Sequence, residues 1–345
     1  MFFFCLFYSI SITYLVNLIL RKYKILIYSA NEKHKEKFNN QILVSGGIII
    51  FLYLLPLVFF NIYKFQNAYI FYFISLIFLV GFLSDFKRIS ASIRLILISV
   101  ITLIYLWLSD TYVLDFKFEF INDFLDDYIF VAIVFTLLCF VILINGFNFT
   151  DGVHGLTIMY TIILILNLNY FTYFILNKDF HNYEILYLIP ILIIIFIYNI
   201  KEKIFLGDSG SYFLASIIGL FVVNLTISKS YSYPYVYGCL LIYPAFEVFF
   251  SILRKIINKG NPLEADKKHL HHLLQNYFQY KFKYKLSLAK ILSGLSINLF
   301  IFIFCFICIH LYENKYLLLL GILTFCIIYL ISYYIIKKQN KIFKV

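Results

Sequence analysis

Eleven apolar segments, each close to the length that crosses a bilayer, follow one another along this sequence. They cover about residues 2–20, 42–61, 67–84, 91–108, 128–145, 156–176, 185–200, 209–227, 235–252, 291–312 and 315–336. Such segments form helices in a membrane, because hydrocarbon offers no water to satisfy an open backbone. Hydrophobic residues make up 63% of the 345 residues and charged residues 14%, a balance that excludes an ordinary soluble domain. The sequence predicts an all-α, polytopic membrane protein with ten or eleven transmembrane helices in a single domain, residues 1–345.

The first apolar run, residues 1–20, lacks the basic start and small-residue cleavage site of a signal peptide. We therefore expect it to be a retained span. The six cysteines all lie in apolar runs, and none is spaced with a histidine as in a metal site. The sequence predicts neither a disulfide nor a zinc centre.

Lysine and arginine are distributed unevenly between the two sets of loops. When the N-terminus is placed outside the cell, 24 of the 29 basic residues fall on the inner side. Positive residues mark the cytoplasmic side of a membrane protein, so the C-terminus is expected inside as well. The net charge of +11 therefore reflects contact with a lipid bilayer and gives no indication of nucleic-acid binding.

The unusual polar clusters of the sequence all fall on this predicted inner side. They occupy residues 31–47, 84–94, 145–156, 201–211 and 247–274. Unrelated turns would have no reason to share one membrane face. We therefore expect one site on the cytoplasmic face, built from the inner loops 21–41, 85–94, 145–156, 201–211 and 253–290.

The most polar of these clusters is Asn145–Leu156, which separates two long apolar runs. It combines two asparagines, Asp151, His154 and three glycines. Asparagine, aspartate and glycine are also turn formers, so a tight turn between two helices is the simpler interpretation. Polar groups at membrane depth are costly without partners and therefore favour a functional site.

Two further clusters place carboxylates beside cations or at a helix start. Asp208 lies between glycines where an apolar run begins, a position suited to binding a cation or a phosphate, or to capping a helix. Asp85 ends the third run and is followed by Lys87, Arg88 and Arg94. Cations that bind phosphates beside an acid that orients or deprotonates them are typical of phosphate chemistry, although basic residues also anchor helices at the interface.

The long basic loop contains His269, His271 and His272 in four positions. We expect His269 and His272 on one face of a helix and His271 on another. Because no cysteine accompanies them, phosphate binding is favoured over zinc, and a solvated basic loop near lipid is the alternative. Glu247 in the ninth run needs a partner, and Arg254 two helical turns later is the candidate.

Together these motifs resemble the polyprenyl-phosphate N-acetylhexosamine-1-phosphate transferases, the glycan-initiating branch of bacterial glycosyltransferase family 4. The resemblance extends from about Lys37 to His272. The motifs that carry it are Ser45-Gly46-Gly47, Gly81–Asp85 with Arg94, Asn145-x-x-Asn148-x-x-Asp151-Gly152-x-x-Gly155-Leu156, Phe205-x-Gly207-Asp208-x-Gly210-Ser211, and Pro262 through His269-x-His271-His272.

The resemblance implies an enzyme of the bacterial inner membrane that transfers N-acetylhexosamine-1-phosphate, expected to be GlcNAc-1-phosphate, from a UDP-sugar to undecaprenyl phosphate. UMP is released, and the product starts a lipid-linked surface glycan. The implied cofactor is Mg²⁺, with Mn²⁺ as an alternative. A homodimer is retained as an option for the oligomeric state. A phospho-MurNAc-pentapeptide translocase-like enzyme and a membrane transporter are the other interpretations.

The resemblance also assigns roles to residues of this chain. The catalytic set is Asp85, Asp151, Asp208, His269, His271 and His272; the substrate-binding set is Arg94, Asn145, Asn148 and His154, to which we add Lys87 and Arg88 as our own expectation; the metal ligands are Asp208 and Asn148.

The chain departs from the family pattern at three positions. Ser84 stands where the family usually has aspartate, Ser92 where it has lysine, and His154 where it has aspartate or asparagine. We expect Lys87 or Arg88 to supply the missing positive charge.

Overall fold

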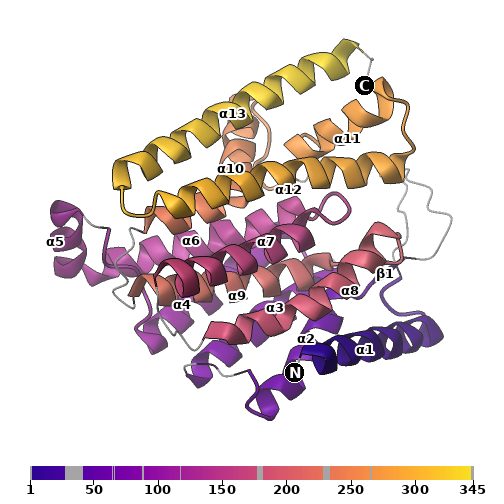
Figure 1. The fold of residues 1–345 in the computed structure, drawn as a ribbon, viewed down its shortest axis with the longest axis horizontal. Helices are drawn as coiled ribbons and strands as arrows, with labels where there is room; N and C mark the ends of the chain where they lie inside the picture. Colours follow the sequence, from indigo (N-terminus) through magenta and orange to yellow (C-terminus); the bar gives the residue numbers. More distant parts are fainter. Residues whose placement is uncertain are drawn as a thin grey trace.

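The computed structural model describes residues 2–27, 42–63, 65, 67–87, 89–116, 118–176, 182–227, 234–264 and 266–342. Almost all of this part of the chain is helical (Figure 1). The α-helices are α1 (Phe2–Tyr23), α2 (Gly46–Phe59), α3 (Ala68–Lys87), α4 (Ala91–Ser109), α5 (Glu119–Asp127), α6 (Ile129–Thr150), α7 (Leu156–Tyr170), α8 (Ile189–Ile200), α9 (Gly207–Ile227), α10 (Tyr235–Ile257), α11 (Leu270–Lys281), α12 (Leu286–His310) and α13 (Lys315–Ile342).

The predicted all-α, multi-pass architecture is confirmed. Among the described residues, nine helices are long and apolar enough to cross a membrane. Two shorter apolar helices, Gly46–Phe59 and Glu184–Ile200, correspond to the second and seventh predicted runs. All eleven predicted runs are therefore helical. The π-helical turn η1 (Phe171–Ile175) continues α7, and the 3₁₀ segment η2 (Asn182–Leu188) leads into α8.

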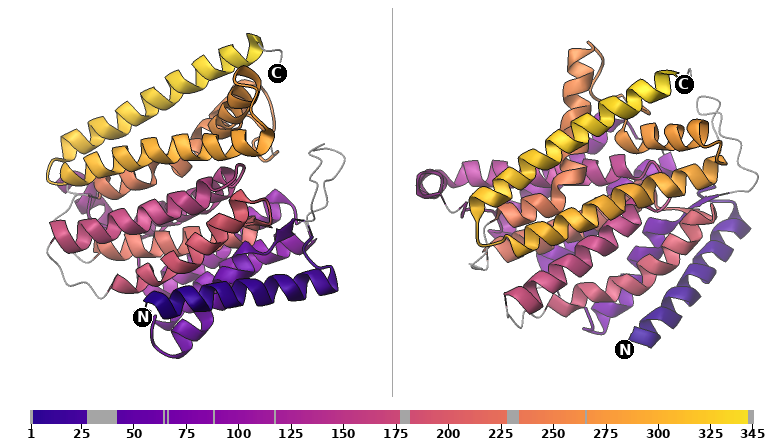
Figure 2. Two further views of the ribbon diagram at one scale, coloured as in Figure 1. Left: turned by 45° about the vertical axis from the view of Figure 1, so that its right-hand side comes forward. Right: turned by 45° about the horizontal axis from the view of Figure 1, so that its top comes forward.

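Helix α9 lies at the centre of the bundle. The most apolar stretch of α9 is 78% buried, whereas the corresponding stretches of α1 and α13 are 28% and 17% buried. Helices α1 and α13 lie on opposite flanks of the molecule (Figure 2). Glycines allow neighbouring helices to approach it closely. A Cβ on Gly81 of α3 would lie 2.5 Å from the Ser209 Cα, and one on Gly47 of α2 would lie 2.3 Å from the Gly210 nitrogen. The start of α9 is therefore held against α2 and α3.

Two short parallel strands fix the chain just before α2 and α9. Strands β1 (Leu43–Val44) and β2 (Ile204–Phe205) pair with Leu43 opposite Ile204. The Gly47 amide then donates a hydrogen bond of 3.0 Å to the Leu206 carbonyl. Gly207 has φ of +77°, a left-handed conformation that a side chain would strain. This turn directs the next residue, Asp208, toward α3.

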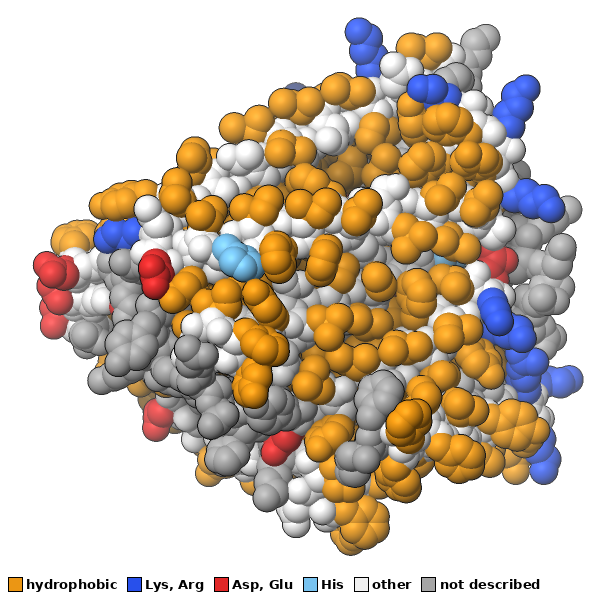
Figure 3. Space-filling model, in the orientation of Figure 1, with side chains coloured by type: hydrophobic (Ala, Val, Ile, Leu, Met, Phe, Trp, Pro, Cys, Tyr) orange, Lys and Arg blue, Asp and Glu red, His pale blue; other side chains and the backbone are white. Residues whose placement is uncertain are grey.

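Charge is separated along the molecule. Figure 3 shows most lysines and arginines at the end that carries β1, most acidic side chains at the end that carries α5, and a largely apolar face between them. The polar clusters that the sequence placed on one side, as far as they are described, lie at the basic end. One predicted loop is more ordered than expected, because residues 270–281 of the stretch 253–290 form α11.

Candidate active site

The site is built around Asp208, the second residue of α9. Its Oδ2 accepts a hydrogen bond of 2.6 Å from the Ser84 hydroxyl and forms an ion pair with Arg94 Nη1. Its Oδ1 accepts a hydrogen bond from the side-chain amide of Asn148. One carboxylate thus joins α3, α4, α6 and α9. The side chains of Asp208 and Arg94 each keep 23% of their surface exposed, so a ligand can reach them.

Ser84, where the family pattern has an acid, is part of this group. It is 7% exposed, and it accepts a hydrogen bond of 3.2 Å from Arg94 Nη1 while donating to Asp208. Arg94 itself lies in the first turn of α4, which begins after the capping Ser90. The hydroxyl therefore aligns the guanidinium with the carboxylate.

Asp85 has a different arrangement from Asp208. It accepts hydrogen bonds of 2.9 Å from the Asp208 amide, 3.0 Å from the Ser209 amide and 2.6 Å from the Ser209 hydroxyl. The first amides of a helix have no partner within it, and a carboxylate there is also stabilised by the helix dipole. Asp85 therefore caps α9 from α3 and fixes the residue that follows the Gly207 turn.

The Asn145–Leu156 cluster is partly helical, because α6 continues to Thr150. Asn148 faces Asp208, with its amide also 3.5 Å from the Ser211 hydroxyl. Asn145, by contrast, donates to the Val141 carbonyl of its own helix at 2.7 Å. The turn predicted here is confined to residues 151–155.

Asp151 follows α6 and lies near the other two acids. Desolvation on burial and the carboxylates of Asp208 and Asp85 raise the pKa of Asp151 well above its usual range, against a hydrogen bond from the Gly207 backbone. An accumulation of carboxylates that repel one another is a suitable place for a cation.

His154 links two of the loops. Its Nε2 lies 3.1 Å from Glu202 Oε1, and its ring stacks on Phe205 with centroids 5.9 Å apart. The Asn199 side chain accepts from the Gly155 amide at 2.7 Å and donates to the Ile204 carbonyl at 2.9 Å. These contacts join residues 151–155 to β2 and so to the start of α9.

The three histidines lie together, not on separate faces. His269 precedes α11, and its ring centroid is 5.4 Å from His271, which in turn is 4.3 Å from His272. The prediction that His271 faces elsewhere was wrong, because His269 is not helical and its backbone is extended. A Cβ on Gly152 would meet His271 Nε2 at 2.5 Å. The histidines therefore adjoin the turn that carries Asp151.

His271 is fully buried, and neither of its ring nitrogens forms a hydrogen bond within the described residues. Burial and the neighbouring His272 and His269 hold its pKa well below the usual range of histidine. The ring is therefore neutral at pH 7, with one nitrogen available as an acceptor and the other as a donor.

The sequence prediction for Glu247 was wrong. Its Oε2 lies 2.8 Å from His269 Nδ1, whereas Arg254 donates to both oxygens of Asp266 at 3.0 and 2.9 Å. The loop after α10 folds back on that helix, so the partners of Glu247 come from a later segment. Partial burial raises the pKa of Asp266. The hydrogen bond from the Lys268 amide and the charge of Arg254 outweigh this effect and hold the pKa below its usual range.

The two basic residues expected to replace the missing lysine are not shown in the site. Lys87 is exposed at the end of α3, and the described contacts of Asp208 do not include it. Arg88 lies outside the described residues. The positive charge that contacts Asp208 comes from Arg94.

A magnesium ion would find oxygen donors here. Within the described residues no three His, Cys, Asp or Glu side chains form a ready metal cage, but Mg²⁺ commonly uses one or two carboxylates together with waters and substrate phosphates. Asp208 accepts three hydrogen bonds, and a carboxylate has about four acceptor positions. Asp208, and Asn148 with its amide turned, therefore fit such an ion.

Fold and site together define a polytopic membrane protein with carboxylates, a guanidinium and imidazoles gathered at the basic end of its helix bundle, a set suited to phosphates and a divalent cation. A family model described as Glycosyl transferase family 4 matches residues 67–226, which contain Asp85, Arg94, Asn148 and Asp208. The chain is therefore similar to this family over the segment that contains these site residues.

Named relatives resemble the chain over alignments of different lengths. The chain is 27% identical over 229 residues to the undecaprenyl-phosphate alpha-N-acetylglucosaminyl 1-phosphate transferase of Thermotoga maritima, an alignment that covers 66% of each protein. It is 29% identical over 165 residues to the decaprenyl-phosphate N-acetylglucosaminephosphotransferase of Mycolicibacterium smegmatis, covering 41% of this chain and 40% of that protein. Both alignments span less than two thirds of the relative.

A third relative bears a different name. The phospho-N-acetylmuramoyl-pentapeptide-transferase of Buchnera aphidicola is 25% identical over 290 residues, 73% of this chain and 78% of that protein.

Proposed function

We propose that this protein transfers N-acetylhexosamine-1-phosphate, in particular GlcNAc-1-phosphate, from a UDP-sugar to undecaprenyl phosphate. A phosphate oxygen of the lipid attacks the phosphorus that carries the sugar, and the bond to the UMP phosphate breaks. The products are the lipid diphosphosugar and UMP. The observation that carries the proposal is the convergence of Arg94, Asn148 and Asp208 in a segment similar to this family.

Bringing two anionic reactants together is the main difficulty of this reaction, so neutralising and aligning phosphates is the main catalytic task. We assign Arg94 and the histidine segment, residues 269–272, to the phosphates. Arg94 presents planar donors that match phosphate oxygens. His271 is neutral and buried, and can donate a hydrogen bond from one ring nitrogen.

Asp208 and Asn148 are proposed to hold Mg²⁺, with Mn²⁺ as a substitute. The ion supplies charge neutralisation of the pyrophosphate when it is bound. Asp151 lies between the carboxylates and the histidines, and we assign it, with His154 and Asn145, to the nucleotide side of the site. Lys87 and Arg88 remain proposed binders of the incoming lipid phosphate at the membrane surface.

We assign Asp85 as a positioning residue, in place of the expected acid that orients or deprotonates a phosphate. Three hydrogen bonds from α9 occupy most of its acceptor positions. Through the Asp208 amide it sets the direction of the carboxylate that contacts Arg94. It would therefore act on the reaction through Asp208.

We place the site at the cytoplasmic face of a bacterial inner membrane, with the N-terminus outside and the C-terminus inside. The separation of basic and acidic ends in Figure 3 supports this orientation. The basic end would also attract the anionic lipid headgroups of the inner leaflet.

The alternative within the family is transfer of phospho-N-acetylmuramoyl-pentapeptide, which the name of the Buchnera relative favours. The two activities share lipid acceptor and chemistry and differ in the donor. A transporter, the alternative outside the family, would bind a UDP-sugar without splitting it.

The test is a panel of UDP-N-acetylhexosamines and UDP-MurNAc-pentapeptide, incubated with purified protein, undecaprenyl phosphate and Mg²⁺. Lipid products are identified by mass spectrometry. A lipid diphosphate carrying one N-acetylhexosamine supports the proposal, and exclusive use of the pentapeptide donor favours the alternative. Absence of a lipid product with every donor contradicts both. Asp208→Asn is the inactive control, since it keeps the size of the side chain.

A further inference from the structure

Glu247 is a buried carboxylate that the proposed catalytic set does not use. It lies in α10 within a membrane-spanning helix and is 1% exposed. A buried charge is costly unless it is paired and hydrogen-bonded, and in a membrane such a residue indicates a function. Its contacts show what it is paired with.

Three of its closest polar contacts come from the histidine segment. His269 Nδ1 lies 2.8 Å from Oε2, the Leu270 amide donates to Oε1 at 3.3 Å, and His271 Nδ1 is 3.9 Å from Oε1. The fourth contact is the Tyr243 hydroxyl, which donates to Oε1 at 3.3 Å from one turn earlier on α10.

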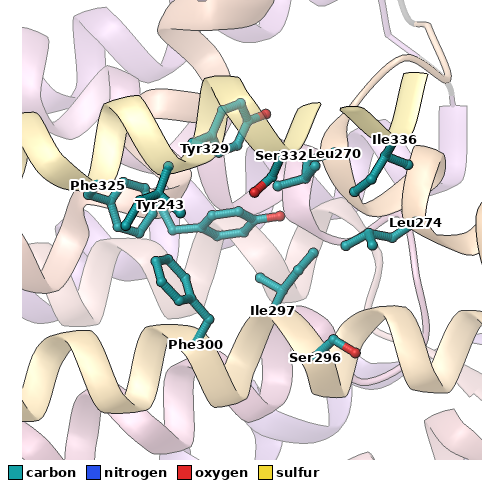
Figure 4. Close-up of a pocket in the computed structure, with 11 residues that line it drawn as sticks. Tyr243, Leu270, Leu274, Ser296, Ile297, Phe300, Phe325, Tyr329, Ser332 and Ile336 are labelled. Carbon is teal, nitrogen blue, oxygen red and sulfur yellow. The ribbon is translucent and has the colours of Figure 1, made fainter. Parts of the chain in front are cut away.

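The surroundings on another side are apolar. Tyr243 and Leu270, both partners of Glu247, line a cavity of about 260 Å³ between α10, α11, α12 and α13. Figure 4 shows them among the side chains of Ile297, Phe300 and Phe325. Electrostatic interactions are stronger in such an apolar environment than in water.

The chemistry of a carboxylate determines the roles of the two partners. An ionised carboxylate only accepts hydrogen bonds, so His269 must carry its proton on Nδ1 and donate it. The other ring nitrogen, Nε2, lies 3.7 Å from Oδ1 of Asp266, which Arg254 also binds. The Leu270 amide belongs to the first turn of α11 and has no partner within that helix. Glu247 therefore fixes both the ring of His269 and the start of the helix that carries His271 and His272.

We propose that Glu247 is a positioning residue for the transfer reaction, which binds Nδ1–H of His269 and holds the histidine segment against the turn at Gly152. This inference rests on the proposed function. It adds a residue outside the segments from which the sequence motifs assigned the site. If Glu247 only stabilised the fold, it would make the same contacts. The test must therefore separate an effect on the position of the histidines from an effect on stability.

A double-mutant cycle makes this separation. Glu247→Gln keeps the shape of the side chain but removes its negative charge and so weakens the hydrogen bond with His269 Nδ1. His269→Gln removes the imidazole ring. We expect Glu247→Gln to lower kcat about tenfold or more, with KM for the UDP-sugar changed less than about twofold. In the His269→Gln background the same change should lower kcat by less than about twofold, because its target is gone.

Tyr160→Phe is the matched control. It removes a buried hydrogen bond of 2.8 Å from Tyr160 of α7 to the Leu240 carbonyl of α10, about two turns before Glu247, and keeps the ring that packs on Tyr243. It should lower the unfolding temperature and leave kcat unchanged. Equal losses of kcat in Tyr160→Phe and Glu247→Gln, or additive losses in the double variant, would overturn the proposal.

A second measurement does not depend on turnover. In ¹⁵N-histidine NMR spectra of the detergent-solubilised protein, the wild type should show an Nδ1-protonated imidazole for His310, whose Nδ1 lies 2.9 Å from the Phe306 carbonyl, and a second such signal for His269. This signal should move in Glu247→Gln and disappear in His269→Gln. An unchanged spectrum in Glu247→Gln refutes the positioning role even if the enzyme has another substrate, whereas absent UMP release by the wild type refutes the proposed function alone.

Discussion

Replacement of Ser84 by alanine tests how Asp208 is held. The hydroxyl donates to Asp208 at 2.6 Å and accepts from Arg94 at 3.2 Å, so the substitution removes two hydrogen bonds to charged groups. The direct ion pair between Arg94 and Asp208 remains. We therefore expect a misaligned carboxylate in a folded protein, not loss of the site.

The expected size follows from the exposure of the three groups. Hydrogen bonds to charged partners contribute about 1.5 to 3 kcal/mol. Ser84 is buried, but Asp208 and Arg94 are each 23% exposed and can recruit water, which favours the lower figure. A loss of about 1.5 kcal/mol in transition-state stabilisation lowers kcat/KM about tenfold.

The assay is UMP release by the purified protein, with Ser75→Ala as the control. Ser75 lies on the same helix, and its buried hydroxyl has no hydrogen-bond partner among the described residues. Its removal should leave kcat/KM unchanged and stability equal or higher. The reasoning fails if Ser84→Ala keeps more than half of the wild-type kcat/KM while Asp208→Asn is inactive.

Three further predictions follow from the same geometry. Asp85→Ala should lower the stability of the folded protein by about 1 to 2 kcal/mol through the lost cap and reduce kcat more than KM; unfolding temperature and UMP release check this, and full activity would contradict it. Gly152→Ala should push His271 or His272 aside, because its Cβ would lie 2.5 Å from His271 Nε2, and wild-type kcat in this variant would be evidence against the contact. The lowered pKa of His271 means that the unfolded chain binds its proton first, so thermal stability should fall as the pH drops below about 6.5. His271→Gln should flatten that dependence, and identical profiles would rule out His271 as its source.

The sequence was sufficient for the fold class and for the convergence of the motifs. Apolar length alone predicted helices at all eleven runs, because a bilayer leaves the backbone few alternatives. The shared face of residues 84–94, 145–156 and 201–211 followed from the distribution of lysine and arginine. The structure joins them through Asp208, Asn148 and Arg94.

The details of partner choice were not predictable in this way. Helical spacing put Arg254 on the same face as Glu247, but the loop after α10 returns to that helix and brings His269 to Glu247 and Asp266 to Arg254. Spacing also separated His271 from its neighbours, since it assumed a helix where His269 is extended. In both cases a long-range contact determined the geometry, and local periodicity carries no signal of it.

The central claim is that a sugar phosphate, and not the sugar alone, moves to the lipid. It is tested most directly with UDP-GlcNAc labelled with ³²P in either phosphate, incubated with the protein, undecaprenyl phosphate and Mg²⁺. The account predicts that label in the sugar-linked phosphate enters the lipid and label in the uridine-linked phosphate leaves as UMP, with both transfers lost in Asp208→Asn. Release of both labels together as UDP, or no label in the lipid with any UDP-sugar, would contradict it.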